Sequence, residues 1–366
     1  MTLRIAIVGC GKIADSHVEQ IRAVGRGEVV AVCDAEPLMS EQLALRYRIP
    51  AHYTDLDNLL AKERVDVLHV ATPPDSHLVL ATKAMQAGCH VFLEKPVALT
   101  EDETQRILQV AETTGRKVAV NYLYNFEAPS LELKQWLASG RLGSIVHVEA
   151  TYGYDLAGDY GVAVLSDTGH WVHRLPGKLF HNVLDHLVCK LALVMPLQPV
   201  QVQCLAYRLR KAVGNPVIDA LADELRVTLK AGAVTATAVI SGHARPVGHT
   251  MRVYGNNDTA VLDYVGRTLV PAPRQTQPGS IGRLGPAVAQ ARAYARSATA
   301  NVRRFWRHEY HFFQGMRVLL DGFYRSIQED TPLPLPYEEI LWSVQTIDRI
   351  VAQIPALTAD GTQEAA

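Results

Sequence analysis

Residues 3–14 read LRIAIVGCGKIA, an apolar, β-branched run that ends in G-x-G-x-x-A and is followed by a helical pattern. Gly9 permits a tight turn, Gly11 lets the backbone approach a pyrophosphate, and Ala14 allows close packing of helix on strand. The helix N-terminus then offers unpaired N–H groups to phosphates. The stretch therefore predicts a dinucleotide site with contacts at Gly9, Gly11, Lys12 and Ile13.

A second apolar run, residues 29–33, ends at Asp34, which follows Gly9 by 25 residues. An acidic residue near this spacing hydrogen-bonds the adenosine ribose diol. Its charge would repel the 2′-phosphate of NADP, and residues 35–37 (AEP) bring no arginine. NAD is therefore favoured over NADP, although a turn or helix-capping role for Asp34 before Pro37 stays open.

Strand-like and helical stretches go on alternating as far as residue 122. Residues 65–73, 90–93 and 118–122 read as strands, and the helix that begins at Thr100 has Glu103 at capping-box spacing. This alternation predicts an α/β Rossmann domain with a doubly wound parallel sheet, whose ligands bind beyond the carboxyl ends of the strands. Several candidate residues fall at such ends: Gly9, Asp34, Thr72, Pro73 and Lys95.

Glu94-Lys95-Pro96 directly follows the strand-like run 90–93. Proline fixes its own φ and biases the preceding residue towards extended backbone, so Lys95 leaves the strand end in a defined direction. A lysine there can hydrogen-bond a reacting oxygen and stabilise charge that grows on it. By itself the tripeptide does not outweigh the alternative, a surface lysine at a strand end. Together with the nucleotide motif upstream, it makes Lys95 the expected catalytic cation.

The G-x-G-x-x-A turn, residues 71–77 (ATPPDSH) and Glu94-Lys95-Pro96 together resemble the glucose–fructose oxidoreductase/inositol dehydrogenase (Gfo/Idh/MocA) superfamily. The resemblance is specific over about the first 150 residues and looser beyond them. It implies that Lys95 lies near the nicotinamide and the reacting carbon. It also implies further cofactor-site residues: Thr72, Pro73, His77 and Glu94.

Beyond residue 123, turn-separated strand-like runs predict an α+β domain with a largely antiparallel open sheet, interrupted by a helix at about 179–195. Residues 1–123 are then the nucleotide-binding domain and 124–340 the substrate and oligomerisation domain. The resemblance implies a helix at 341–358 that packs back on the first domain, and homo-oligomers formed through the second-domain sheet. Residues 359–366 are expected to be disordered.

The resemblance also predicts the catalytic residues of the second domain, where the family usually shows G-G-x-x-x-x-D-x-G-x-H-x-x-D. His186 matches the histidine, and Asn182, on the same helix face, takes the aspartate position; Leu184 and Cys189 are further departures. His186 is expected to give or take the proton, since its ordinary pKa is about 6.5. Asn182 can position a hydroxyl or the imidazole but cannot accept a proton as aspartate does.

A packed core histidine is the alternative for His186, and the segment holds competitors: His170, His173, His181 and Asp185. These histidines lack a compact ligand pattern, and the five cysteines show no C-x-x-C, so no metal is expected. The expected walls of the substrate cleft are Tyr122, Tyr124 and Trp171.

Composition bounds the remaining possibilities. A chain of 366 residues, 48% hydrophobic and with net charge −1, is expected to be a globular protein with core enough for two domains. Lone cysteines, no signal-peptide pattern and no apolar run of membrane-spanning length make the cytoplasm the expected compartment. No motif points to nucleic acid.

Residues 271–310 are a basic insertion with seven arginines and one acid, Glu309. One interpretation is a lid or docking arm for an anionic partner, either a phosphorylated or nucleotide-linked substrate or an anionic membrane surface. The other, which we favour, is an insertion that packs on the sheet and leaves its arginines in solvent.

The expected function is an NAD(P)-dependent oxidoreductase that interconverts a secondary alcohol and a ketone on a sugar, polyol or sugar-nucleotide. Two alternatives stay open. A catalytically silent nucleotide-binding sensor or scaffold is favoured by the altered helix motif. A redox-neutral NAD-dependent sugar lyase or hydrolase would use the same cofactor.

Overall fold

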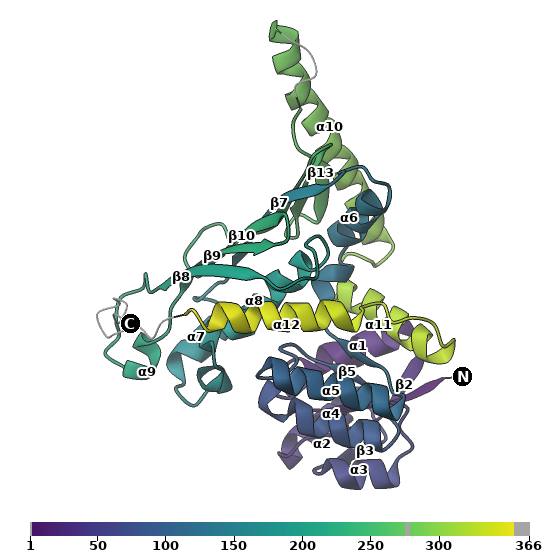
Figure 1. The fold of residues 1–366 in the computed structure, drawn as a ribbon. Helices are drawn as coiled ribbons and strands as arrows, with labels where there is room; N and C mark the ends of the chain where they lie inside the picture. Colours follow the sequence, from purple (N-terminus) through teal and green to yellow (C-terminus); the bar gives the residue numbers. More distant parts are fainter. Residues whose placement is uncertain (1, 275–278, 355–366) are drawn as a thin grey trace. The chain divides into compact units, whose positions relative to one another are not determined.

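The computed structural model describes residues 2–274 and 279–354 (Figure 1). Contacts divide the chain into two units, residues 2–123 with 313–345 and residues 124–312 with 346–354. The predicted disordered tail at 359–366 lies outside the described residues, as do residues 355–358 of the predicted C-terminal helix.

The first unit is built on a parallel sheet of strand order β3-β2-β1-β4-β5-β6, which is the Rossmann order. Strands β4 and β5 are buried almost throughout, as expected when helices cover both faces. The strands are β1 (Leu3–Val8), β2 (Gly27–Cys33), β3 (Ala51–Tyr53), β4 (Val67–Val70), β5 (His90–Leu93) and β6 (Val118–Val120).

Local sequence signals account for the helices between these strands. At the start of α5, the Thr100 hydroxyl accepts a hydrogen bond from Glu103 N at 3.3 Å, and the Glu103 carboxylate accepts from Leu99 N at 2.9 Å. The helix ends at Gly115 in the left-handed conformation. The helices are α1 (Ala14–Val24), α2 (Pro37–Tyr47), α3 (Leu56–Lys62), η1 (Pro74–Ser76), α4 (His77–Gln86) and α5 (Glu101–Thr114).

A late segment of the chain also belongs to the first unit. Helix α11 (Gln314–Gln328) contacts α1, and its Phe323 ring lies 6.0 Å from that of Phe92 on β5. The sequence predicts residues 313–340 in the second domain, whereas the contacts group residues 313–345 with the first unit. The chain position of a helix does not reveal which core its apolar face joins. Helix α12 (Tyr337–Val351) is divided between the units: Gln345 donates to Glu101 in the first, and Arg349 donates to Val200 O in the second.

The second unit holds a mixed sheet of order β13-β12-β11-β7-β10-β9-β8. The β7–β10 pairing is parallel and the others are antiparallel. Together with the first sheet, this confirms the predicted fold class. The strands are β7 (Ile145–Gly153), β8 (Gln201–Tyr207), β9 (Glu224–Ala231), β10 (Val234–Ser241), β11 (His249–Gly255), β12 (Thr259–Asp263) and β13 (Thr268–Pro271).

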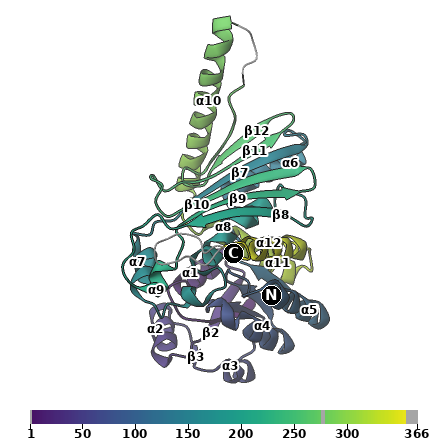
Figure 2. The same cartoon turned by 60° about the vertical axis from the view of Figure 1, so that its left-hand side comes forward.

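Helix α8 lies against one face of this sheet and packs on β7, while α10 runs along the β13 edge (Figures 1 and 2). None of the helices in the described part of the chain is both long enough and apolar enough to span a bilayer. The remaining helices are η2 (Leu123–Phe126), α6 (Ala128–Ala138), α7 (Asp159–Ser166), η3 (Trp171–Arg174), α8 (Lys178–Leu191), α9 (Pro216–Asp219) and α10 (Gly279–Trp306).

Candidate functional site

The turn between β1 and α1 has the geometry that a phosphate cradle needs. Gly9 has a φ of 91°, and a Cβ there would lie 2.6 Å from the Ala71 carbonyl carbon, so only glycine fits. A Cβ at Gly11 would meet nothing within 4 Å, which leaves open space beside the backbone. Helix α1 begins just after this turn. These features fit the pyrophosphate of a dinucleotide.

Asp34 lies at the carboxyl end of β2 and is tied to the glycine turn. Its Oδ2 accepts a hydrogen bond from Cys10 N at 2.7 Å, and its Oδ1 accepts from Glu36 N at 2.9 Å. A carboxylate has about four acceptor positions, so both oxygens keep capacity for a ribose diol. The turn role and the ribose role proposed from the sequence are therefore compatible.

His77 joins the loops that follow β4 and β5. Its Nε2 lies 2.9 Å from Thr72 O and its Nδ1 lies 3.0 Å from Val97 O. Burial lowers the pKa of His77, although the two carbonyls favour the charged ring. Both nitrogens face backbone oxygens, so His77 ties the Thr72-Pro73 segment to the loop after β5, and its place in the cofactor site stays a prediction.

Glu94 lies at the end of β5 in a buried chain of polar side chains. Its Oε1 is 2.9 Å from His17 Nε2 and accepts a hydrogen bond from Asn121 Nδ2 at 2.6 Å. The His17 and His69 Nδ1 atoms are 2.8 Å apart, and His69 Nε2 is 2.7 Å from the Tyr324 hydroxyl. The chain therefore runs from β5 through α1 and β4 to α11.

Hydrogen bonds can link this chain from end to end. An ionised Glu94 can only accept, so His17 donates to it through Nε2. The two Nδ1 atoms need one donor and one acceptor between them, and the Tyr324 hydroxyl can donate to His69 Nε2 or accept from it. Burial, and then the proximity of His17, lower the pKa of His69 well below its usual value.

The same hydrogen bonds keep Glu94 ionised. Burial by itself would raise the pKa of Glu94, but the bonds from His17 and Asn121 and the charge of Lys95 outweigh it and lower that pKa. A fixed negative charge therefore lies directly before Lys95 in the chain.

Lys95 follows Glu94 at the same edge of the sheet as Gly9 and Asp34. The residue is half-buried, its backbone N lies 3.3 Å from Glu94 Oε2, and the Lys95–Pro96 peptide is cis. The structure thus gathers the predicted residues of the first unit at the carboxyl ends of β1, β2, β4 and β5. Tyr122, predicted as a cleft wall, is instead buried, with 2% of its surface exposed.

His186 and Asn182 lie on α8 in the second unit. The His186 ring lies 5.3 Å from each of the Tyr124 and Tyr152 rings, edge-on to Tyr124. Asn182 donates a hydrogen bond to the Tyr160 hydroxyl at 3.0 Å. Of the predicted cleft walls, Tyr124 therefore lies beside the predicted histidine, and a tyrosine on α7 is the partner of Asn182.

Lys190, one turn beyond His186 on α8, was missed by sequence reasoning. It is fully buried, its Nζ contacts His249 Nε2, and it lies 4.3 Å from the centre of the Tyr264 ring. Burial lowers its pKa to about 7. The signal in the sequence is a lysine within the apolar run of residues 187–191 (LVCKL).

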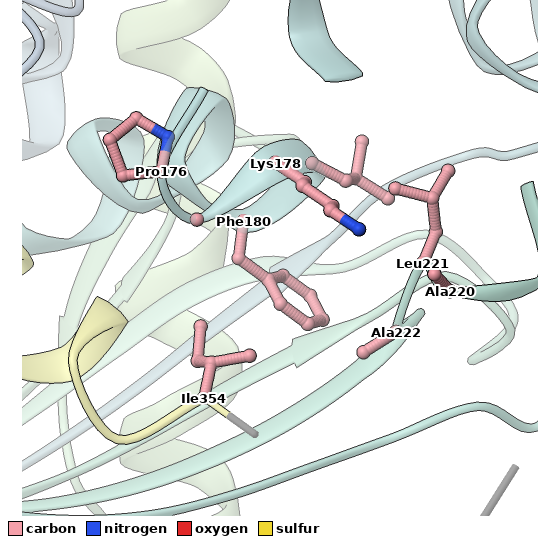
Figure 3. Close-up of a pocket in the computed structure, with 9 residues that line it drawn as sticks. Pro176, Lys178, Phe180, Ala220, Leu221, Ala222 and Ile354 are labelled. Carbon is pink, nitrogen blue, oxygen red and sulfur yellow. The ribbon is translucent and has the colours of Figure 1, made fainter. Parts of the chain in front are cut away.

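Neither the surroundings of Trp171 nor the pocket in Figure 3 includes His186. Trp171, on η3, packs on a hydrophobic cluster that includes Val164 and Val172. The pocket measures about 230 Å³ and lies at the start of α8. Its lining side chains are apolar apart from Lys178, which extends towards Leu221 (Figure 3). It contains none of the predicted site residues.

Comparison with protein families gives a match for each of the two domains. Residues 3–122 match the oxidoreductase family with an NAD-binding Rossmann fold, and residues 130–261 match the GFO/IDH/MocA C-terminal domain. The chain belongs to the Gfo/Idh/MocA family. The predicted family and its NAD-binding domain are thereby confirmed, whereas the roles of individual residues stay predictions.

Each of three curated relatives of this Gfo/Idh/MocA chain matches it over less than half of the relative's length. D-glucoside 3-dehydrogenase of Escherichia coli K12 is 31% identical over 39% of this chain and 41% of its own. Inositol 2-dehydrogenase of Salmonella typhimurium LT2 is 30% identical over 42% and 46%. A glycosyl hydrolase family 109 protein of Shewanella pealeana is 29% identical over 46% and 39%. The chain thus spans less than half the length of these relatives.

Solved structures of the family share the whole fold. The WlbA dehydrogenase from Bordetella pertussis, in complex with NADH and UDP-GlcNAcA, has a TM-score of 0.74 at 19% identity over 96% of this chain and 95% of its own. A levoglucosan dehydrogenase with NADH and levoglucosan has a TM-score of 0.77 at 16% identity over 96% and 97%. At these identities the likeness establishes the fold alone.

Proposed function

We propose that the protein is an NAD-dependent oxidoreductase that interconverts a secondary alcohol and a ketone on a sugar, polyol or sugar-nucleotide. The observation that carries this proposal is the position of Lys95 beside the ionised Glu94, at the sheet edge that also holds Gly9 and Asp34. A cation at the carboxyl edge of a dinucleotide-binding sheet is placed for charge stabilisation at a bound substrate.

NAD, when bound, supplies or accepts the hydride. Gly9, Gly11 and the start of α1 would hold its pyrophosphate, and Asp34 its adenosine ribose. The Lys95 ammonium would hydrogen-bond the reacting oxygen and stabilise the negative charge that develops there during reduction. The opposite charges of Glu94 and Lys95 attract each other, and this attraction contributes to the lowered pKa of Glu94.

His186 is the proposed proton donor and acceptor, and Asn182 the residue that orients a substrate hydroxyl. Tyr124 and Tyr152 support the His186 ring on two sides. Asn182 donates to Tyr160 through its amide nitrogen, and an amide oxygen is a group that can accept from a substrate hydroxyl. Neither role requires the negative charge of the aspartate that the family usually has at position 182.

The substrate class is proposed from the relatives, which are named for glucosides and inositol, and from the neighbours solved with a UDP-sugar or levoglucosan. Homo-oligomerisation through the second-domain sheet and a cytoplasmic location are proposed from the family resemblance. NAD is preferred to NADP because of the Asp34 charge.

The test is Lys95→Met, compared with Lys83→Met at an exposed lysine paired with Asp57. Wild-type protein and both variants are titrated with NADH and then assayed with NAD⁺ and a panel of glucosides, inositols and UDP-sugars. We expect Lys95→Met to lose at least a hundredfold in kcat while its Kd for NADH changes less than threefold, because the loss falls on the developing charge. Lys83→Met should match wild type.

Other outcomes separate the alternatives. Unchanged turnover in Lys95→Met would contradict the assignment of Lys95. Protein that retains NAD through purification and converts a glycoside without net NADH formation would identify a redox-neutral enzyme. NADH binding with no turnover on any substrate would favour a sensor, and no NADH binding at all would overturn the proposal.

A further inference from the structure

Helix α10 turns its polar face towards the sheet and its apolar face towards solvent, the opposite of an ordinary surface helix. The half-buried face, towards β13, carries small or polar residues: Pro286, Gln290, Ala293, Ser297, Ala300 and Arg304. Asn301, beside this face, donates a hydrogen bond to Gly266 O at 2.9 Å. A helix that rests on a sheet normally turns its apolar stripe inward.

The apolar residues of α10 lie about 200° around the helix from that face, because the two sets are offset by two residues. This outer stripe comprises Leu284, Val288, Ala291, Ala295, Ala298, Val302 and Phe305, and every member is exposed. Leu284 is 66% exposed, Phe305 62% and the neighbouring Trp306 76%. Figures 1 and 2 both show α10 extending beyond the end of the sheet. The exposed fractions show that the described part of the second unit leaves this stripe uncovered.

The stripe has the spacing of a coiled-coil seam. Its members are separated by 4, 3, 4, 3, 4 and 3 residues, the alternation of a heptad repeat. Their sizes are also symmetric along the helix: large side chains at both ends, valines next, and three alanines in the middle. Reversing the helix leaves this order of sizes nearly unchanged.

A symmetric order of sizes is what a two-fold interface requires, since each residue must meet its counterpart on an identical surface. We propose that the outer stripe of α10 pairs antiparallel with the same stripe of a second copy of this chain, about a two-fold axis near Ala295. Leu284 then lies opposite Phe305, Val288 opposite Val302, and Ala291 opposite Ala298. The central alanines let the two helix backbones approach closely.

The residues beside the stripe suit this pairing. With the axis near Ala295, Trp306 comes level with residues 284–285, where Gly285 leaves room for the indole, and Arg292 comes level with residues 298–299, which carry no charge. The other arginines, at 283, 296, 303 and 304, lie farther from the seam. No flanking pair brings two charges together, although α10 carries five arginines and no acid.

The exposed area is large enough for such a pair. Six large apolar side chains on or beside the stripe are at least 41% exposed. Their exposed parts amount to roughly 600 Å² per copy if a whole large side chain counts as about 150–250 Å². Two copies would bury roughly 1,200 Å² if the pairing covered all of these exposed parts, against the about 1,000 Å² expected of a specific interface.

An anionic membrane fits the stripe less well. Membrane binding of an amphipathic helix grows with the apolar area it inserts, and the three central alanines would add little. The same alanines are what close helix pairing needs.

The first test measures the mass of the full chain in solution by light scattering after gel filtration. Ala295→Glu places charges at the centre of the proposed seam, and Ala289→Glu makes the same change at an exposed position of α10 off the stripe. We expect a twofold fall in mass for Ala295→Glu and the wild-type mass for Ala289→Glu. A monomeric wild type, or equal masses for all three proteins, would overturn the proposal.

The second test uses a covalent readout that does not depend on weakening the protein. Ala295→Cys should form a disulfide-linked dimer under mild oxidation, because the two copies of residue 295 lie near the axis, whereas Ala289→Cys should not. Absence of the cross-link, or equal cross-linking of both variants, would contradict the antiparallel pairing. Flotation of wild type with phosphatidylglycerol vesicles but not phosphatidylcholine vesicles, combined with a monomeric mass, would assign the stripe to a membrane instead.

Discussion

Lys190 is a buried cation whose described partners include no carboxylate. Its Nζ contacts the His249 ring and lies 4.3 and 5.4 Å from the centres of the Tyr264 and Tyr124 rings. Burial, and then the charge of Lys190, lower the pKa of His249 well below its usual value. Tyr124 also contacts the His186 ring, so Lys190 and His186 both lie against this group of aromatic rings.

The low pKa of Lys190 makes stability depend on pH. An unfolded lysine titrates near 10.4, whereas burial lowers the pKa of folded Lys190 to about 7. Between these values the unfolded chain binds more protons, so this group adds stability as pH rises from about 7 to about 10, and its full cost is present below pH 7.

We therefore expect Lys190→Met to raise the free energy of unfolding by a few kcal/mol at pH 6 relative to wild type, with the gain vanishing towards pH 10. Urea unfolding at several pH values measures this difference. Lys211→Met, at an exposed lysine, should show no such trend. A gain for Lys190→Met that stays constant with pH would contradict the shifted pKa.

At the scale of elements, the turn from β1 to α1 contains two glycines with different expected roles, one structural and one in binding. Gly9→Ala would drive a Cβ against the Ala71 carbonyl at a φ of 91°, and Gly11→Ala would meet no protein atom within 4 Å. We expect Gly9→Ala to lower stability by about 2 kcal/mol or more. Gly11→Ala should keep wild-type stability and weaken NADH binding about tenfold, because its methyl group would occupy the approach of the pyrophosphate.

Differential scanning fluorimetry without ligand and a fluorescence titration with NADH measure the two effects. Equal melting temperatures of the two variants would contradict the structural difference between the glycines. Unchanged NADH affinity in Gly11→Ala would place the pyrophosphate elsewhere.

At the scale of the whole molecule, the first unit is completed by a segment that follows the second unit in the chain. Four fully buried side chains of α11 belong to its core: Leu319, Leu320, Phe323 and Tyr324. Burying each is worth about 1.5–3 kcal/mol, so together they match the stability of a typical domain.

A chain that ends at residue 312 should therefore lose NADH binding and become protease-sensitive throughout residues 2–123, while a chain that ends at residue 354 keeps both properties. Calorimetric titration with NADH and limited proteolysis with mass mapping check this. Retention of NADH affinity by the shorter chain would show that α11 is dispensable for the Rossmann unit.

Local pattern was sufficient for most of the fold. Alternating apolar strands and helices predicted the parallel sheet of the first unit. Strand β13, at Thr268–Pro271, was missed because four residues beside a proline-rich stretch carry too little periodicity. The sequence assigned residues 313–340 to the second domain, whereas α11 packs in the core of the first unit, whose other residues lie before residue 124.

The nucleotide-binding residues and Lys95 could be read from residues 3–96, because turns, strand ends and helix starts depend on neighbours in the chain. The link from Glu94 through His17 and His69 to Tyr324 could not, since each partner comes from a different element. The contact of Lys190 with His249 could not be read from the sequence either, nor could the exposure of the apolar face of α10. Hydrogen bonding and burial depend on which elements contact each other in the folded chain, and local sequence periodicity does not determine those contacts.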